Sequence, residues 1–256
     1  MNFIHSFQSE WLKTKRSSAS WLTLAGGIFI PLIILSDLLL NHENLPAAYS
    51  GAHFWDRHFS KSWQFMAFFL LPVGVILASS LITQLEFRNN TWKQLLTTPQ
   101  KLTSIFFAKL LVIMVMMFQF FILFNIGIYV SGVIPSLLFS NVSYPKEPIP
   151  FAGFLQWNLW FFIDCLPVIA LQYLLSLQFK NFLVPIGAGL GIFLAAVIAN
   201  SWQYVYLIPY SYCMVSFMRS QGRFSASLPI HLIAIGYFLL FTIISYILFI
   251  VKKEKG

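Results

Sequence analysis

The sequence is poor in charged residues. Asp, Glu, Lys and Arg together make up 9% of its 256 residues, whereas 58% are hydrophobic and the mean hydropathy is +0.76. A soluble domain carries about 25% charged residues. The shortage of charge therefore excludes an ordinary soluble domain and indicates an integral membrane protein.

The sequence also lacks the motifs of common hydrolases. It contains no Walker A sequence, no HExxH zinc motif and no GxSxG nucleophile elbow. Its two cysteines, Cys165 and Cys213, lie in different segments without the spacing of a zinc site, and we expect no disulfide between them. We therefore expect no catalytic residue, metal or cofactor in this chain.

Basic residues outnumber acids, with 16 Lys and Arg against 8 Asp and Glu. They stand between or beside the apolar runs, where lipid headgroups and insertion topology favour positive charge. The formal net charge of +8 thus predicts contact with a lipid bilayer and not with nucleic acid.

Long apolar runs recur along the chain. A membrane-spanning helix needs about 20 mostly apolar residues, and six segments have this character. They are Trp21–Leu40, Trp63–Thr83, Ile105–Val130, Phe151–Leu177, Phe182–Trp202 and Pro229–Val251. We predict an all-α membrane protein with one transmembrane domain over residues 1–256.

The distribution of basic residues orients the spans. With both termini on one side, only five of the 16 Lys and Arg residues fall on the other side: Arg57, Lys61, Lys146, Arg219 and Arg223. This bias places both termini in the cytoplasm, in a multi-pass protein of the cytoplasmic (inner) membrane.

Two of the outer connections are unusual. Ser131–Pro150 contains four prolines, which predicts a stiff, extended crossing. Tyr204–Met218, within the connection 203–228, is too aromatic for a solvated loop and is broken by Pro209. We expect it to dip into the outer membrane interface, where tyrosines anchor at headgroup level.

The polar stretch Gln84–Lys109 separates the second and third spans. Leu85, Trp92 and Leu96 recur in it at helical spacing, and polar side chains occupy the remaining surface. This pattern predicts a short amphipathic helix at the membrane surface, within the connection 84–104. Pro99 ends the helix, because a residue that precedes proline is disfavoured in the α conformation.

A second amphipathic segment, Asn2–Arg16, precedes the first span. Phe3, Phe7 and Trp11 share one face, which predicts an interfacial helix over residues 1–19 with a basic end. The alternative is a disordered basic tail.

Asp164 lies near the middle of the fourth span and is the clearest ionisable group inside the membrane. It is either a substrate or proton site, or a structural acid bonded to Gln172, Asn158 or a neighbouring span. We favour the structural role, because a proton relay normally uses more than one carboxylate.

Two further features are open to more than one interpretation. Glu86 stands at the inner end of the second span and either pairs locally or contacts the basic surface of a partner. Gly187 and Gly191 lie one helical turn apart in the fifth span and permit close packing of another helix.

Three segments resemble the membrane subunits of ABC-2 type exporters, especially the permeases of lantibiotic and bacitracin self-protection systems. SEWLKTKRSSASWL, at Ser9–Leu22, is similar to the family's opening elbow. EFRNNTWKQLLTTPQKLTSIFFAKL, at Glu86–Leu110, is similar to the segment between its second and third spans. WQYVYLIPYSYC, at Trp202–Cys213, is similar to its aromatic segment before the last span.

The resemblance implies a role for each cytoplasmic segment. Glu86–Thr98 would be a coupling helix seated on a cytosolic ATP-binding cassette subunit, and Asn2–Arg16 would be the connecting elbow. The residues implied in ATPase coupling are Glu86, Arg88, Asn90, Thr91, Lys93 and Pro99. Two permease subunits, identical or related, would surround a path along which a peptide or amphiphilic antimicrobial compound is exported.

Two other classes of function remain open at this point. One is a proton-coupled carrier or intramembrane enzyme centred on Asp164, which also stands as a candidate residue of the substrate path. The other is a passive scaffold subunit of a larger complex. A neighbouring reading frame that encodes an ATPase with Walker motifs would favour the exporter.

Overall fold

The computed structural model describes residues 3–15, 17–88, 101–222 and 229–254, with the backbone alone at 86–88 and 252–254. These residues form helices and no strand. The α-helices are α1 (Phe3–Thr14), α2 (Ser18–Leu40), α3 (Leu45–Ser50), α4 (Phe54–Phe65), α5 (Leu71–Arg88), α7 (Leu102–Leu138), α8 (Phe151–Gln178), α9 (Leu183–Ile198), α10 (Tyr212–Ser220) and α11 (Ile230–Glu254).

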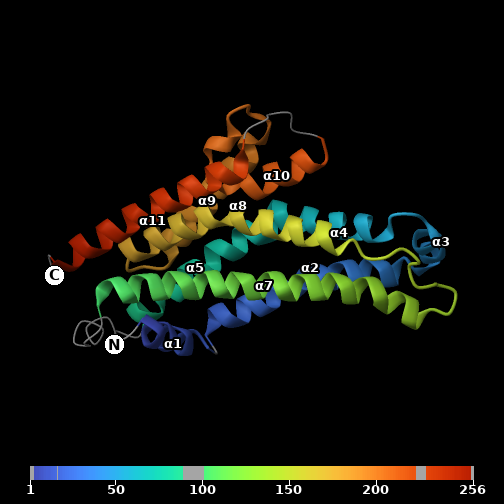
Figure 1. Ribbon diagram of the computed structural model, residues 1–256, viewed down its shortest axis with the longest axis horizontal. Helices are drawn as coiled ribbons and strands as arrows, with labels where there is room; N and C mark the ends of the chain where they lie inside the picture. The colour runs from blue at the N-terminus through green and yellow to red at the C-terminus, as the bar shows by residue number, and fades with distance from the viewer. Residues whose placement is uncertain (1–2, 16, 89–100, 223–228, 255–256) are drawn as a thin grey trace.

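Within the described ranges, six helical segments are long and apolar enough to cross a membrane, which confirms the predicted all-α class and six spans. They are Ser18–Leu40, Phe54–Leu85, Leu102–Leu138, Phe151–Gln178, Leu183–Ser201 and Ile230–Val251. The two ends of the chain lie at the same end of the elongated bundle (Figure 1), as an even number of crossings requires. We call this the terminal end, and the end that holds α3 the far end.

The second span begins earlier than predicted. The connection expected at Asn41–Ser62 contains α3 and most of α4, and a π-helical turn at Met66–Leu70 joins α4 to α5. Trp55 and Phe59 are buried there although charged residues separate them. The charges reduce the mean hydropathy of α4, and the packing of its aromatic face against neighbouring helices keeps it helical.

The third span ends later than predicted. α7 continues through Pro135 to Leu138, so the expectation of an extended crossing from Ser131 was wrong for its first eight residues. Pro135 stands only three residues before the end of the helix, where the loss of its backbone donor disturbs little of the remaining helix. The Tyr49 hydroxyl donates to the Gly132 carbonyl oxygen at 2.8 Å and holds this turn against α3.

Helices α2 and α7 cross in close contact. Gly127 of α7 faces the ring of Pro31 of α2, and a Cβ atom at Gly127 would stand 2.7 Å from Pro31 Cγ. Only glycine permits this approach. Small residues at such crossings let two membrane helices gain van der Waals contact that the lipid does not provide.

α8 is the central helix of the bundle. It packs against α11 along much of its length and against α5 on another side (Figure 1). The helix α10 and the short 3-10 turns before it also contact α8, and their segment from Pro209 to Phe217 is buried. Tyr210 and Tyr212 therefore lie inside the protein. The sequence had suggested that the tyrosines of this segment anchor at the headgroup level of the membrane.

Candidate functional site

The expected coupling helix lies largely outside the described residues. α5 runs to Arg88 and α7 begins at Leu102, so Glu86 and Arg88 belong to the last turn of α5. The positions Asn90, Thr91, Lys93 and Pro99 fall in the stretch between the described ranges. Their role in ATPase coupling therefore remains a prediction from the sequence.

The structure shows how the first helix is attached to the bundle beside this stretch. The residues of α1 that are buried are Ser6, Glu10 and Thr14, spaced four apart on one face. α1 packs on α7 and also touches α5. Its polar stripe thus faces the protein, while Phe3, Ile4 and Leu12 stay exposed. The helix predicted for this segment is present as α1, and its position at a membrane interface stays a prediction.

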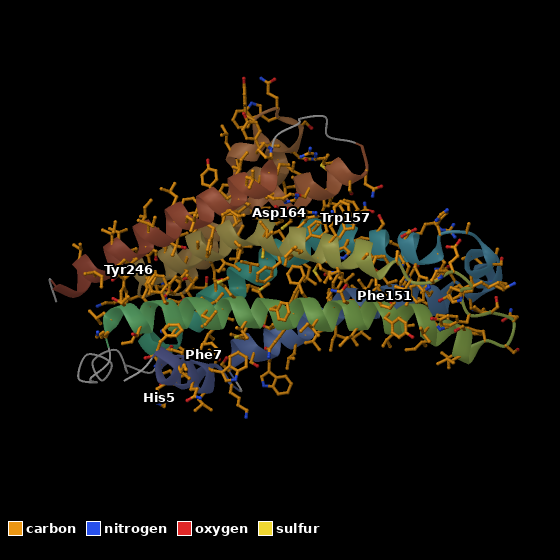
Figure 2. The ribbon with its side chains drawn as sticks, in the orientation of Figure 1. His5, Phe7, Phe151, Trp157, Asp164 and Tyr246 are labelled. Carbon is orange, nitrogen blue, oxygen red and sulfur yellow. The ribbon has the colours of Figure 1, made fainter. Side chains whose placement is uncertain are left out.

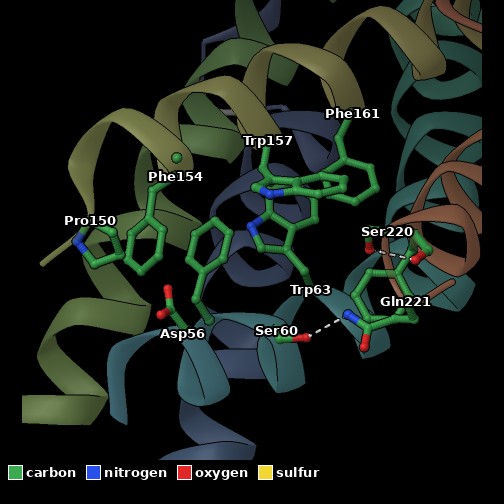
Figure 3. A pocket seen from close by; sticks show the side chains of 12 residues that line it. Asp56, Ser60, Trp63, Pro150, Phe154, Trp157, Phe161, Ser220 and Gln221 are labelled. Carbon is green, nitrogen blue, oxygen red and sulfur yellow. Dashed lines mark hydrogen bonds between the residues drawn. The ribbon is translucent and has the colours of Figure 1, made fainter. Parts of the chain in front are cut away.

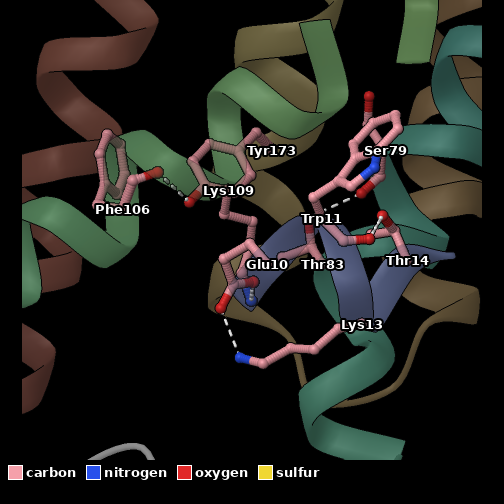
Figure 4. Close-up of polar contacts among 9 residues, drawn as sticks. All are labelled: Glu10, Trp11, Lys13, Thr14, Ser79, Thr83, Phe106, Lys109 and Tyr173. Carbon is pink, nitrogen blue, oxygen red and sulfur yellow. Dashed lines mark hydrogen bonds and ion pairs between the residues drawn. The ribbon is translucent and has the colours of Figure 1, made fainter. Parts of the chain in front are cut away.

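An ion pair fastens this contact (Figure 4). Glu10 and Lys109 are 5% and 3% exposed, and Lys109 Nζ lies 3.5 Å from Glu10 Oε2. The half-exposed Lys13 pairs with the other oxygen, Oε1, of the same carboxylate. A charge buried this far is stable only with a partner, so Glu10 and Lys109 together hold α1 against the first two turns of α7.

Asp164 lies about halfway along the bundle on α8 (Figure 2). Its side chain is fully buried. Ser216 of α10 donates a hydrogen bond to Oδ2, and His231 Nδ1 of α11 lies 2.8 Å from Oδ1. The His231 ring stacks on Trp160 with centroids 4.1 Å apart. Asp164 therefore joins α8 to the start of α11 and to the buried segment that precedes it.

The predicted partners of Asp164 were partly wrong. Asn158 pairs with Asn125 of α7 through two amide hydrogen bonds of 2.7 and 2.9 Å. Gln172 donates to Ser80 of α5 and to the Pro185 carbonyl oxygen of α9. The expectation of a bond to a neighbouring span holds, but through His231, which the sequence analysis did not single out.

The geometry of this cluster argues against a serine-histidine-aspartate relay. Such a relay needs the serine hydroxyl on the imidazole, so that the imidazole can accept its proton. Here both Ser216 and His231 bind the carboxylate of Asp164. Nor do the described residues contain a group of three or more His, Cys, Asp or Glu side chains able to hold a metal ion.

Two neighbouring cavities open beside this cluster. One of about 410 Å³ is lined by Trp157, Trp160 and His231, together with Arg219 and Ser216. The other, of about 250 Å³, lies between α4, α8 and α10 and is walled by aromatic rings (Figure 3). Trp157 and Ser220 line both cavities. Asp164 is fully buried, so it acts on the first cavity through its two partners that line it, His231 and Ser216.

The glycines of α9 lie on two different faces of the helix. A Cβ atom at Gly189 would stand 2.5 Å from Gln172 Oε1, so Gly189 allows α8 and α9 to meet within the chain. A Cβ atom at Gly187 or Gly191 would meet nothing within 4 Å. Gly187 and Gly191, which the sequence suggested as a packing face, therefore lie away from the other described residues of this chain.

A family model provides the deciding comparison. The model described as "ABC-2 family transporter protein" matches residues 6–198, which is more than half of the chain. The chain belongs to the ABC-2 transporter family. It is therefore the membrane permease subunit of an ABC transporter, a multi-pass membrane component and not itself an enzyme. No curated protein matches the sequence.

The matched range shows which elements of this chain correspond to the family model. It includes most of α1, the ion pair between Glu10 and Lys109, all of α8 and α9, and the stretch between α5 and α7. α10, α11 and His231 follow the matched range. The polar cluster at Asp164 thus combines one residue from the matched range with two from beyond it.

Proposed function

We propose that this ABC-2 permease is the membrane subunit of an exporter that moves a peptide or amphiphilic antimicrobial compound outward. A separate cytosolic ATPase provides the energy, and a second permease subunit completes the path. The resemblance of Ser9–Leu22, Glu86–Leu110 and Trp202–Cys213 to lantibiotic and bacitracin self-protection permeases supports the choice of substrate class.

The observation that carries the proposal is the buried ion pair between α1 and α7. Lys109 lies seven residues after Leu102, about two helical turns into α7, which follows the expected coupling segment. A force applied there by an ATPase acts on α5 and α7 directly. Because Glu10 binds Lys109, α1 moves with α7 and the force reaches the membrane through rigid helices.

The face of α9 that carries Gly187 and Gly191 supports the proposal of a second permease subunit. Gly187 and Gly191 leave open space toward the other described residues. Both this span and the last one are little buried within the chain, at 22% and 17%, so the small residues distinguish the face of α9. Close approach at small residues is a common way for membrane helices to associate. In a dimer this face would meet the same face of an identical chain or a related one.

The coupling step is tested with the partner ATPase present. Co-purification with mass spectrometry identifies the ATPase, and export is then measured with the wild type and with Glu86→Lys and Asn90→Trp. Both variants should insert in normal amount yet uncouple ATP hydrolysis from export, because these positions lie on the polar face of the predicted helix. Full export by both variants with the ATPase still bound contradicts the coupling role.

The subunit contact is tested by cross-linking. Gly191→Cys should form a disulfide-linked dimer on mild oxidation, whereas Leu239→Cys on α11 should not. Leu239 is a matched control because it is also in a span and 53% exposed. Equal cross-linking of both variants, or of neither, argues against a dimer contact at α9.

One observation favours a second candidate, a proton-coupled carrier. Such a carrier needs a second titratable group beside Asp164, and His231 provides one. The two candidates differ in their requirement for a partner. Transport by the purified chain alone, driven by a proton gradient without ATP, would favour the carrier.

A further inference from the structure

The smaller cavity is lined by twelve residues, and six of them contribute aromatic rings. They come from α4, α8 and α10, and we call the cavity the aromatic chamber (Figure 3). Its rings are Phe59, Trp63, Phe154, Trp157, Phe161 and Phe217. They belong to three separate helices, so only the folded protein brings them together.

The rings of the aromatic chamber are held in place by stacking on one another. Phe59 and Phe154 stack with centroids 3.8 Å apart and planes 7° from parallel. Trp63 and Phe161 stack at 4.1 Å and 13°. Each pair joins α4 to α8. A ligand therefore meets rigid aromatic surfaces, and binding does not have to order flexible side chains first.

The aromatic chamber carries charge of one sign. Among the side chains that line it in the described part of the chain, Asp56 is the one that is charged, and it stands at the first turn of α4. Ring faces attract cations through their quadrupoles, most strongly for tryptophan. A carboxylate beside ring faces therefore favours a ligand that carries positive charge on an apolar body.

The chamber also holds hydrogen-bonding groups. Gln221 donates from Nε2 to the Ser60 hydroxyl at 3.2 Å (Figure 3). The hydroxyls of Ser60 and Ser220 and the amide of Gln221 also line the chamber. A peptide presents both kinds of partner, carbonyl oxygens and amide hydrogens.

We propose that the aromatic chamber binds a segment of an amphipathic peptide, with a cationic side chain at Asp56 and an apolar side chain between the rings. Peptide binding needs only the folded chain, whereas the role of the aromatic chamber as the substrate site rests on the proposed export. The neighbouring cavity, which shares Trp157 and Ser220, takes the following residue of the peptide. Arg219 lines that cavity, so positive charge is favoured at the Asp56 side alone.

The binding is measured by calorimetry on the purified full chain in nanodiscs of zwitterionic lipid, with empty nanodiscs subtracted. The probe is the tripeptide acetyl-Lys-Phe-Ser-amide, whose third residue is uncharged and suits the cavity that Arg219 lines. Acetyl-Glu-Phe-Ser-amide is the control of equal length and opposite charge. The first peptide should bind and the second should not, because Asp56 repels its carboxylate.

Two variants locate the site. Asp56→Asn should weaken binding about three- to fivefold, the effect of an exposed ion pair. Trp157→Leu keeps an apolar wall but removes a ring face, and it should weaken binding about tenfold. Asp37→Asn is the matched control. Asp37 is another exposed acid toward the far end. It has a partner in Lys61, as Asp56 has in His53 at 3.4 Å, but it does not line the chamber, so this variant should bind as the wild type does.

Several results would overturn the proposal. They are no binding of the cationic tripeptide, equal binding of the anionic one, and unchanged binding by both Asp56→Asn and Trp157→Leu. A co-purifying phospholipid that the tripeptide fails to displace would assign the chamber to lipid instead. Because the assay uses no ATPase, a failed export experiment leaves a positive binding result intact, and failed binding leaves the ATPase-driven export standing.

Discussion

The chain buries two acids in opposite ways. Glu10 on α1 is paired with two lysines at the terminal end of the bundle, whereas Asp164 on α8 meets a hydroxyl and an imidazole halfway along it. The partners of Glu10 are lysine side chains, whereas one partner of Asp164 is the ring of His231, which lines a cavity. The first acid serves attachment, and the second lies where a ligand can influence its partner.

The largest effect is expected at the ion pair. Lys109→Leu removes the buried partner of Glu10 and leaves Lys13, which is 36% exposed, as its ion-pair partner among the described residues. Loss of one member of a buried pair costs about 3–5 kcal/mol. The amount of folded, monodisperse protein and its thermal unfolding midpoint in detergent should both fall.

The double variant Glu10→Leu with Lys109→Leu sharpens this result. It removes both buried charges and keeps apolar volume at the contact, so it should recover most of the lost stability. A double variant as unstable as Lys109→Leu would mean that the apolar packing around these side chains, and not their charges, attaches α1.

A smaller effect is expected at the contact between α8 and α9. Gly189→Ala places a Cβ atom 2.5 Å from Gln172 Oε1. Gln172 also accepts from the Tyr210 hydroxyl at 2.9 Å, so it cannot move without loss of that bond. Overpacking of this kind costs about 1–3 kcal/mol. Gly191→Ala is the matched control on the open face and should unfold at the temperature of the wild type.

Asp164→Asn should cost less, about 1 kcal/mol. An amide keeps an oxygen for His231 and offers N–H groups to the Ser216 hydroxyl, which can accept as well as donate. Thermal unfolding checks the stability, and export measured in the same variant tests the role. Asp164→Lys should fail to fold, since a buried lysine has no acceptor there but His231 and Ser216. Loss of export by a stable Asn variant would make Asp164 functional.

The smallest effect is expected at the exposed pair near the far end. Lys61 Nζ lies 2.7 Å from Asp37 Oδ2, and both side chains are about half exposed. Water competes for both charges, so Lys61→Leu should change the stability by less than about 1 kcal/mol. Thermal unfolding compared with Lys109→Leu then measures what burial adds to an ion pair. Equal losses of stability in the two variants would contradict the expected difference between the buried and the exposed ion pair.

The span boundaries show where the sequence was insufficient. The boundaries of the first and fourth spans could be placed to within a few residues, because their apolar runs end where their helices end. Trp55 to Ser62 could not be assigned to a span. Asp56, Arg57 and Lys61 interrupt its hydrophobicity, while the burial of Trp55 and Phe59 depends on the rings of α7 and α8.

The residues of the candidate site also include one that the sequence indicated and one that it did not. Asp164 was found because an acid inside an apolar run is costly and therefore noticeable. His231 was missed because it stands at the very start of the last span, 67 residues away from Asp164. A histidine at a span terminus is an ordinary feature of a sequence. Only the approach of α11 to the middle of α8 makes this one a partner of Asp164.

The sequence by itself determined the membrane class, the six spans and the family resemblance, since hydropathy over about 20 residues and short motifs are local properties of the chain. The tertiary structure decided which polar residues meet. Glu10 and Lys109, Asp164 and His231, and the rings of the aromatic chamber come from helices far apart in the sequence. Their contacts depend on how the helices rotate and cross, and hydropathy carries no record of either.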